Sequence, residues 1–313
     1  MRHLTLTILA LAACGTDGAT SEPDAATSTR GFEIQSPDVT IEPGQEITYC
    51  YYFKTPNTED MVIKKWSSSM TPGSHHMIMF TTTTDSMPPG TISDAECGGF
   101  SASNVPSWTY AAQTPENAIA LPTDDGTGTP LGQEIPAGTS GYFQMHYLNA
   151  SDEPLVAHVK LVAEAYEPGA AYTNTAAYVT YNSQISIPPG ATNHVESKTC
   201  SVPAGSKFWT LSTHAHKQAT TTTVKDGMPA STAVAFTSDD WEHPGANSWT
   251  TAPFYEFASG KLTYECTYSN TGSNAGGTVV SGPSAATNEM CMATGYYFPA
   301  TKPLICLNSL GPF

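Results

Sequence analysis

From Phe32 onward the chain alternates short runs of apolar and β-branched residues with polar turns, and this pattern predicts strands. A turn signal of proline and glycine precedes several of these runs, because proline presets the backbone of a turn and glycine closes it. Such signals are Pro43-Gly44, Pro136-Ala137-Gly138, Pro189-Gly190 and Pro203-Ala204-Gly205, and strand-like runs follow at 46–53, 141–148 and 207–213. No stretch has the spacing of a convincing amphipathic helix. We therefore predict an all-β protein made of antiparallel sandwiches.

The pattern also divides the chain. Residues 15–31 have almost no bulky apolar side chains, which predicts a disordered tether. The best boundary further on lies at residues 167–172, which contain Pro168-Gly169. We expect an N-terminal domain over residues 32–168 and a C-terminal domain over residues 169–313, each with its own cysteines and its own group of histidines.

The first residues resemble an export signal. Arg2 and His3 precede an apolar run over residues 4–13, which is too short to cross a bilayer. The run ends in Leu11-Ala12-Ala13-Cys14-Gly15, which resembles the lipobox of bacterial lipoproteins, so residues 1–14 are expected to direct lipidation of Cys14. Ordinary cleavage after Ala12 also fits the small-residue rule. We expect an exported protein, periplasmic or at the cell surface, that meets a bacterial membrane only through this anchor.

Composition narrows the functional classes. The net charge of −16 argues against nucleic acid as a partner, because no basic patch would offset the repulsion of the phosphates. The motifs of serine hydrolases, zinc proteases and phosphate-binding loops are missing from the sequence. With Cys14 set aside for lipid, six cysteines remain, and an exported chain is expected to pair them in three disulfides. They are Cys50, Cys97, Cys200, Cys266, Cys291 and Cys306.

The clearest candidate chemistry lies in the second half, at His214, His216 and Met290. Residues two apart in a strand point the same way, so the two imidazoles are expected on one face of a sheet. Met290 can supply a thioether from another strand. Its neighbour Cys291 then points elsewhere, and Cys266 is a candidate partner for it. Imidazole together with thioether is the ligand set of a copper ion that cycles between two redox states.

A second group is formed by His75, His76 and His146 in the first half. Adjacent residues of a regular strand point to opposite faces, so His75 and His76 share one ion only if the strand is irregular there or one ring curls round. Pro72-Gly73, directly before them, permits such an irregularity. His146 would complete a site of three nitrogens.

These motifs resemble, in order, those of the copper type II ascorbate-dependent monooxygenases, the family of peptidylglycine alpha-hydroxylating monooxygenase and dopamine beta-hydroxylase. The resemblance covers roughly residues 32–310 and rests on Ser74-His75-His76-Met77, Gln144-Met145-His146-Tyr147, Thr213-His214-Ala215-His216 and Glu289-Met290-Cys291. It implies two tandem jelly-roll domains that face each other across a solvent cleft. It also implies the disulfides Cys50–Cys97, Cys200–Cys306 and Cys266–Cys291.

The resemblance further implies two copper ions and a hydroxylation reaction. The copper held by His75, His76 and His146 would store and deliver an electron, while that of His214, His216 and Met290 would bind oxygen beside the substrate. Ascorbate or a similar one-electron donor would reduce both, and a small-molecule or peptide-like substrate would be hydroxylated at a C–H bond with O2.

The chain departs from the peptide hydroxylases of that family at the residues that hold the substrate's carboxylate. Ser212 stands two positions before the histidine pair, where those enzymes have arginine, and Met292 and Thr294 stand where they have asparagine and tyrosine. A glycine-extended peptide is therefore not the expected substrate.

Two other functions remain open from the sequence: a copper-binding surface lipoprotein without turnover, and a jelly-roll module that binds carbohydrate or protein. His158 and His194 are interpreted as structural or surface residues, as is His243, although its loop is a candidate to line the cleft. Asp239-Asp240 is interpreted as a solvated turn.

Overall fold

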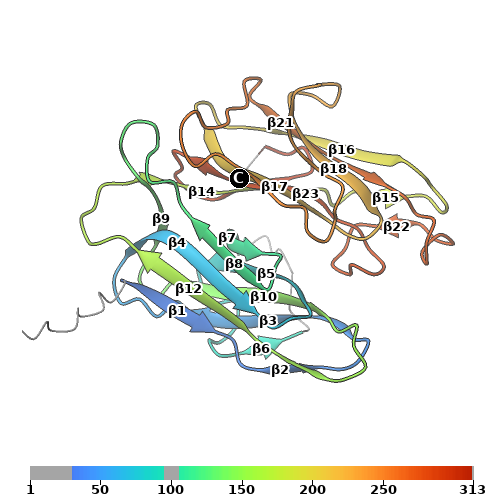
Figure 1. Ribbon diagram of the computed structural model, residues 1–313, viewed down its shortest axis with the longest axis horizontal. Coiled ribbons are helices and arrows are strands. Elements are labelled where there is room, and N and C mark those ends of the chain that lie inside the picture. The colour runs from blue at the N-terminus through green and yellow to red at the C-terminus, as the bar shows by residue number, and fades with distance from the viewer. Residues whose placement is uncertain (1–29, 95–105, 312–313) are drawn as a thin grey trace, which may run out of the picture.

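The computed structural model describes residues 30–94 and 106–311, and over these residues the protein consists of strands, turns and loops (Figure 1). The all-β prediction is confirmed. No helix long and apolar enough to cross a membrane occurs in this part of the chain. The predictions for residues 1–14, Cys14, the tether up to residue 29, and Cys97 fall outside the described residues.

The first half forms two main antiparallel sheets. One has six strands in the order β1 (Gly31–Gln35), β12 (Val159–Ala165), β4 (Met61–Met70), β9 (Leu131–Ile135) and β13 (Thr173–Asn174), with β8 (Glu116–Ala120) also paired to β4. The other has the order β6 (Ile92–Ser93), β3 (Glu46–Lys54), β10 (Ser140–Leu148), β5 (Ser74–Thr82) and β7 (Ser107–Ala112). A short ladder joins β2 (Val39–Ile41) to β11 (Leu155–Ala157). The parallel pair β9 and β13 is the exception to antiparallel pairing here.

The second half repeats this plan. Its five-stranded sheet has the order β20 (Asn247–Ser248), β17 (Lys207–Ala215), β23 (Cys291–Phe298), β14 (Ala176–Tyr181) and β24 (Leu304–Leu307). Its four-stranded sheet has the order β16 (His194–Ser201), β21 (Lys261–Tyr268), β18 (Ala219–Asp226) and β19 (Val234–Ser238), and β15 (Ser186–Ile187) pairs with β22 (Val279–Val280). The chain passes from the sheets of the first half to those of the second between Asn174 and Ala176. Strand β13 still pairs with β9 of the first half, while β14 pairs with β23 and β24 of the second. The jelly-roll connectivity and the exact domain division stay predictions.

The predicted turns are present and are made by glycine in the left-handed region of backbone conformation. Gly44, Gly138, Gly190 and Gly205 all have positive φ, between 59° and 75°. Only glycine adopts this region without a steric penalty. The turn after Gly44 leads into β3, that after Gly138 into β10, and that after Gly205 into β17. The sequence therefore located two of the strands that carry candidate ligands, β10 with His146 and β17 with His214.

Both predicted disulfides of the second half are confirmed, and each links its two sheets. Cys200 of β16 is bonded to Cys306 of β24, and Cys266 of β21 is bonded to Cys291 of β23. Cys50 is also disulfide-bonded. Because Cys291 is fixed from the opposite sheet, the start of β23 and the adjacent Met290 have a defined position. Disulfides are consistent with an exported protein in an oxidising compartment.

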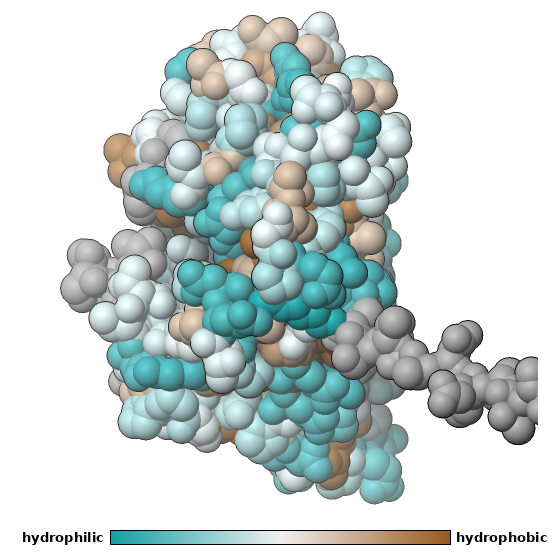
Figure 2. All heavy atoms as spheres, turned by 90° about the vertical axis from the view of Figure 1, so that its left-hand side faces the viewer, coloured by the Kyte–Doolittle hydropathy of each residue, from teal (hydrophilic) through white to brown (hydrophobic). Residues whose placement is uncertain are grey.

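The largest hydrophobic core runs through both halves. It contains buried residues of the first half such as Trp66, Tyr110 and Phe143, and from the second half Trp209 and Tyr296. Figure 1 shows the sheets of the first half below and those of the second half above, with β7 and β8 of the first facing β14 and β17 of the second. On the face shown in Figure 2, hydrophobic residues lie scattered among hydrophilic and weakly polar ones. The apolar surface has thus been collected inside each half and between the two halves.

Candidate metal centre

A β-bulge brings His75 and His76 together. In the ladder between β5 and β10, His146 pairs with His76, but Tyr147 pairs with Ser74, so His75 is the extra residue on its strand. Gly73, with φ of 99°, ends the tight turn that starts β5. A bulge re-aims a side chain that a regular strand would send to the other face. The irregularity that the sequence required for a shared site is therefore present.

The three histidines of the first half form a compact group, which we call the first set. Their ligand nitrogens all lie within 4.8 Å of one another. The ring centroids of His75 and His76 are 5.1 Å apart, and that of His146 lies 5.2 Å from His75 and 5.1 Å from His76. Such a group has the dimensions to enclose one metal ion.

The second set, His214, His216 and Met290, lies where β17 meets β23. The rings of His214 and His216 are 5.3 Å apart. In the ladder His214 pairs with Met292 and Ala215 with Cys291, so Met290 precedes β23 at the level of His216. Met290 and His214 also line the same cavity. The assignment of Met290 as a ligand stays a prediction, and Met292, opposite His214, is a second thioether on that wall.

Burial keeps these imidazoles neutral, which is the form that binds metal. Desolvation lowers the pKa of His75 to about 4 and that of His216 to about 3. It also lowers the pKa of His76 and His214 well below the usual value, and neighbouring histidines lower these two further. For His146, desolvation lowers the pKa although Glu46 opposes it. At neutral pH all five side chains offer a lone pair.

Several of those lone pairs have no partner within the protein. His75 Nε2, His76 Nδ1, His146 Nδ1 and His216 Nε2 are buried and make no hydrogen bond. Buried polar atoms without partners are rare in native proteins and point to a missing ion or water. Neutral imidazole nitrogens with a thioether nearby suit copper. The residues present therefore fit the metal that the sequence implied.

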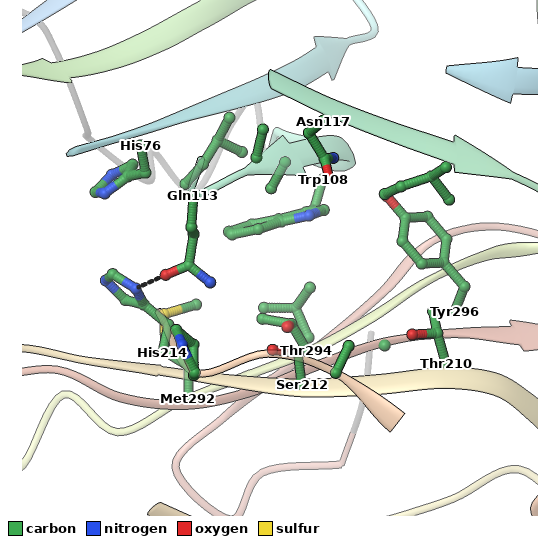
Figure 3. A pocket seen from close by; sticks show the side chains of 18 of the residues that line it. His76, Trp108, Gln113, Asn117, Thr210, Ser212, His214, Met292, Thr294 and Tyr296 are labelled. Carbon is green, nitrogen blue, oxygen red and sulfur yellow. Dashed lines mark hydrogen bonds between the residues drawn. The ribbon is translucent and has the colours of Figure 1, made fainter. Parts of the chain in front are cut away.

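The opposite ring nitrogens are held by hydrogen bonds, as metal-binding histidines require. His146 Nε2 lies 3.0 Å from Glu46 Oε1, and His216 Nδ1 lies 3.2 Å from the carbonyl of Asn288. His214 Nδ1 lies 3.0 Å from Gln113 Oε1, a contact drawn in Figure 3. Since these acceptors take the N–H, they fix the tautomer and leave the other nitrogen free for a ligand.

The second half of the chain also matches a family by sequence. The family model described as copper type II ascorbate-dependent monooxygenase, C-terminal domain, covers residues 174–312. Residues 174–312 are therefore similar to the C-terminal domain of that family. The match includes His214, His216 and Met290, so the second set lies inside the matched segment.

The curated proteins and the solved structures give no close relative at a useful similarity. No curated protein matches the chain in sequence. Among solved structures, the triple jelly roll protein of an archaeal virus turret is 7% identical with a TM-score of 0.21, over 89% of this chain and 62% of that one. Tripeptidyl peptidase 2 is 12% identical with a TM-score of 0.23, over 88% of this chain and 24% of that one. A Sulfolobus turreted icosahedral virus structure is 10% identical with a TM-score of 0.22, over 84% and 59%. The chain spans less than two thirds of each, and such low TM-scores carry no argument.

The segment that matches the family packs directly against the first set. The ring centroids of His76 and His214 are 5.2 Å apart, and those of His75 and His214 are 6.3 Å apart. The resemblance had implied sets that face each other across solvent, but in this structure they are in contact, with a cavity beside them. Neutral rings allow this packing, because two imidazolium ions at such a distance would repel each other.

That cavity has a volume of about 750 Å³ and lies between the halves. His76 belongs to one wall, while His214 and Met290 of the second half belong to the other. Figure 3 shows His76 and Gln113 on one side of the space and His214 on the other. A molecule in this cavity would reach residues of both sets.

Three residues of the site carried no prediction. Glu46 and Gln113 come from the first half, and no local signal marks them, because their partners lie 100 and 101 residues away. Glu289 stands in a quoted motif but had no assigned role. Its buried carboxylate accepts the backbone N–H of His216 at 2.9 Å and of Gln218 at 2.7 Å, which holds the turn after β17. An acidic residue beside a candidate ligand was the available signal.

The other histidines of the described residues, His158, His194 and His243, belong to neither set. His158 pairs with Asp38 and His194 with Glu196, which agrees with a structural or surface role. His243 is exposed and lines the cavity, as one of the two interpretations of its loop allowed. Asp240 accepts the backbone N–H groups of Glu242 and His243, which is the geometry of a turn.

Proposed function

We propose that the protein is an exported copper-dependent monooxygenase that hydroxylates an organic C–H bond with O2 and a one-electron donor such as ascorbate. The observation that carries the proposal is the set of four buried imidazole nitrogens without partners, one of which, on His216, lies in the segment that matches the copper type II monooxygenase family. Lipid attachment at Cys14 and the presence of two coppers belong to the same proposal.

The residues divide the work between them. His75, His76 and His146 would hold one copper, and His214, His216 and Met290 the other; bound copper supplies one-electron redox chemistry and a place for oxygen. Glu46 and Gln113 orient His146 and His214 through their N–H groups. A substrate in the cavity would lie beside both sets, with its apolar part shielded from water. Contact between His76 and His214 gives electrons a short path between the sets.

Glu289 fixes the backbone that carries His216 of the second set. Its two backbone contacts fix the turn His216-Lys217-Gln218, while the disulfide of Cys291 fixes the strand that follows Met290. Both the imidazole and the thioether are therefore presented by rigid backbone, which a ligand set needs in order to hold its geometry.

The test is oxygen uptake by the copper-loaded protein with ascorbate, measured with product hydroxylation across neutral aromatic and aliphatic C–H donors. We expect turnover in the natural protein and its loss in Met290→Ala. Met228→Ala is the matched control, because that methionine is 60% exposed and distant from the described site residues in the sequence. Unchanged turnover in Met290→Ala would reject the assignment of this ligand.

X-ray absorption of the reduced protein separates the two thioethers. Loss of the sulfur signal in Met290→Ala, with its retention in Met292→Ala, supports Met290 as the ligand; the reverse result assigns Met292. Stable copper binding without oxygen uptake on any donor would favour a copper-binding lipoprotein that does not turn over. No copper after reconstitution would favour a binding module.

A further inference from the structure

The cavity between the halves is formed almost wholly by uncharged side chains. Among the described residues that line it there is no aspartate, glutamate, lysine or arginine. The ionisable groups on its walls are tyrosines and the histidines His76, His214 and His243. His76 and His214 are buried, and His243 is exposed.

Both walls are largely apolar and aromatic. One wall, from β5, β7 and β10, presents Phe80, Trp108 and Tyr142. The other, from β17 and β23, presents Trp209 and Tyr296. Figure 3 shows the Trp108 ring edge-on, with Ser212 and Thr294 across the space. Flat rings on such walls favour a molecule with a planar or compact apolar body, which they contact over a large area.

The polar groups on the walls are hydroxyls and amides. Ser212 and Thr294 pair across the ladder of β17 and β23, so their side chains lie next to each other on the cavity side. Gln113 and Asn117 contribute amides from the opposite wall. Three of these groups are already in part engaged, since Ser212 donates to the carbonyl of Gly245, Gln113 Oε1 is bonded to His214 and Asn117 donates to Tyr110. The remaining capacity is that of single neutral donors and acceptors, which suits a hydroxyl, carbonyl or amide of a bound molecule.

A charged molecule would be bound poorly here. An ammonium or carboxylate group that leaves water needs a counter-charge, and without one the desolvation cost exceeds what neutral hydrogen bonds return. An uncharged molecule has no such cost, and burial of its apolar surface is favourable. The volume of about 750 Å³ lies within the range of small-molecule sites, about 300–1,000 Å³.

We propose that this cavity selects an uncharged, largely apolar small molecule with one or a few hydroxyl, carbonyl or amide groups, and rejects free amines and carboxylates. The inference rests on the proposed function only for the statement that the molecule is a substrate. Selection itself depends on the walls and does not require turnover.

The experiment compares three probes of nearly equal shape: phenethyl alcohol, which is neutral, phenethylamine, which is a cation, and phenylacetate, which is an anion. Binding to the purified full chain is measured by equilibrium dialysis and by quenching of tryptophan fluorescence. All three probes are measured without copper, because bound copper(II) would itself supply a counter-charge to the anion; the alcohol and the cation are also compared with copper(II) present and no reductant, so that no turnover occurs. We expect the alcohol to bind at least about tenfold more tightly than either ion without copper, and at least about tenfold more tightly than the cation in both forms.

Equal or tighter binding of either ion overturns the proposal, and so does a failure to detect binding of the alcohol in both forms. Oxygen uptake with reductant is recorded separately. If the alcohol binds as expected but no probe or other donor supports oxygen uptake, the selection by charge stands and the proposed function fails.

Variants at one wall position locate the effect in the cavity. Ser212→Arg is expected to raise the affinity for phenylacetate at least about tenfold, and Ser212→Asp that for phenethylamine, because each supplies the missing counter-charge. Ser212→Gln is the matched neutral control and should keep the preference for the alcohol. Thr294→Lys and Thr294→Glu repeat the exchange on the paired strand if thermal melting shows a Ser212 variant to be unfolded. Unchanged preferences in folded charged variants at both positions would overturn the proposal.

Discussion

Single side chains decide whether the two histidine sets are ready to receive metal. Each set is buried, and burial disfavours the imidazolium form. Three ring nitrogens are held by an acceptor on the protein, and four others have no partner. Glu46 is the most connected of the acceptors, because it also accepts the backbone N–H of Ala285 in the second half at 2.9 Å. It therefore orients His146 and ties the first set to the loop that leads to Met290.

Replacement of Glu46 by alanine should weaken copper binding by the first set. The N–H of His146 would lose its acceptor and the ring its fixed orientation, and loss of such outer partners lowers metal affinity by about 10–100-fold. Competition with a copper(I) chelator measures the change. Glu42→Ala, an exposed glutamate that precedes the same strand, is the control and should bind copper as the natural protein does. Equal affinities in both variants would mean that Glu46 has no orienting role.

The metal-free protein should lose stability as the pH falls below about 6.5, the pKa of histidine in an unfolded chain. All five histidines have folded-state pKa values below this, about 4 for His75 and about 3 for His216, so the unfolded chain binds more protons. Their contribution is present above pH 6.5 and is lost as the pH falls toward those values. Glu289 acts in the opposite direction, because burial raises its pKa to about 7.

Since five groups oppose one, the net free energy of unfolding should decrease on acidification. Urea denaturation of the metal-free protein at a series of pH values from neutral to weakly acidic checks this. A free energy that stays constant or rises over that range would show that the histidines are not buried in their neutral form.

At the scale of elements, the bulge in β5 turns two adjacent histidines into one ligand group. The bulge depends on the turn that precedes it, in which Gly73 has a φ of 99°. A Cβ added at this glycine would lie 2.7 Å from Leu155 Cδ2. The backbone conformation therefore disfavours a larger residue, and a Cβ would also require the end of the Leu155 side chain to shift, so this position sets the start of β5 and its irregularity.

Gly73→Ala should destabilise the protein by about 1–3 kcal/mol, from backbone strain and the contact with Leu155. It should also weaken copper binding by the first set, because the register of His75 depends on the turn. Urea denaturation and chelator competition measure the two effects. Gly44→Ala is the matched control: its φ is also positive, at 70°, but a Cβ there meets nothing within 4 Å. It should lose less stability and bind copper normally; equal losses in both variants would contradict the role of the bulge.

At the scale of the whole molecule, the two halves are joined by more than the chain. Trp209 and Tyr296 of the second half belong to the same core as Trp66 and Tyr110 of the first. Tyr296 also donates its hydroxyl hydrogen to the carbonyl of Thr109 at 3.0 Å. A shared core couples the unfolding of one half to that of the other, because separation would expose its apolar surface to water.

Thermal unfolding of the full chain should therefore occur in one transition. Calorimetry tests this, since the calorimetric and van't Hoff enthalpies agree when unfolding is all-or-none. Two resolved transitions would show that the halves unfold independently and that the contact between the histidine sets adds little to stability.

The sequence by itself determined the all-β class, several turns and the strands that follow them, and it named the candidate ligands. Alternating apolar positions and proline-glycine turns are local signals, so β3, β10 and β17 began where they were expected. The disulfides Cys200–Cys306 and Cys266–Cys291 followed from the resemblance, and the second also from the alternation of side chains along a strand. The sequence showed that His75 and His76 can share one site only if their strand is irregular. The register of the ladder between β5 and β10 shows that irregularity.

Tertiary structure alone decided how the sets lie and what surrounds them. The contact of His76 with His214, the acceptors Glu46 and Gln113, and the neutral cavity all join residues about a hundred positions apart or more. No local pattern encodes such contacts. They form when the two halves bury a shared apolar surface, because this packing also places polar side chains of one half against those of the other. The burial that makes the histidines neutral and the cavity selective is a property of that packing.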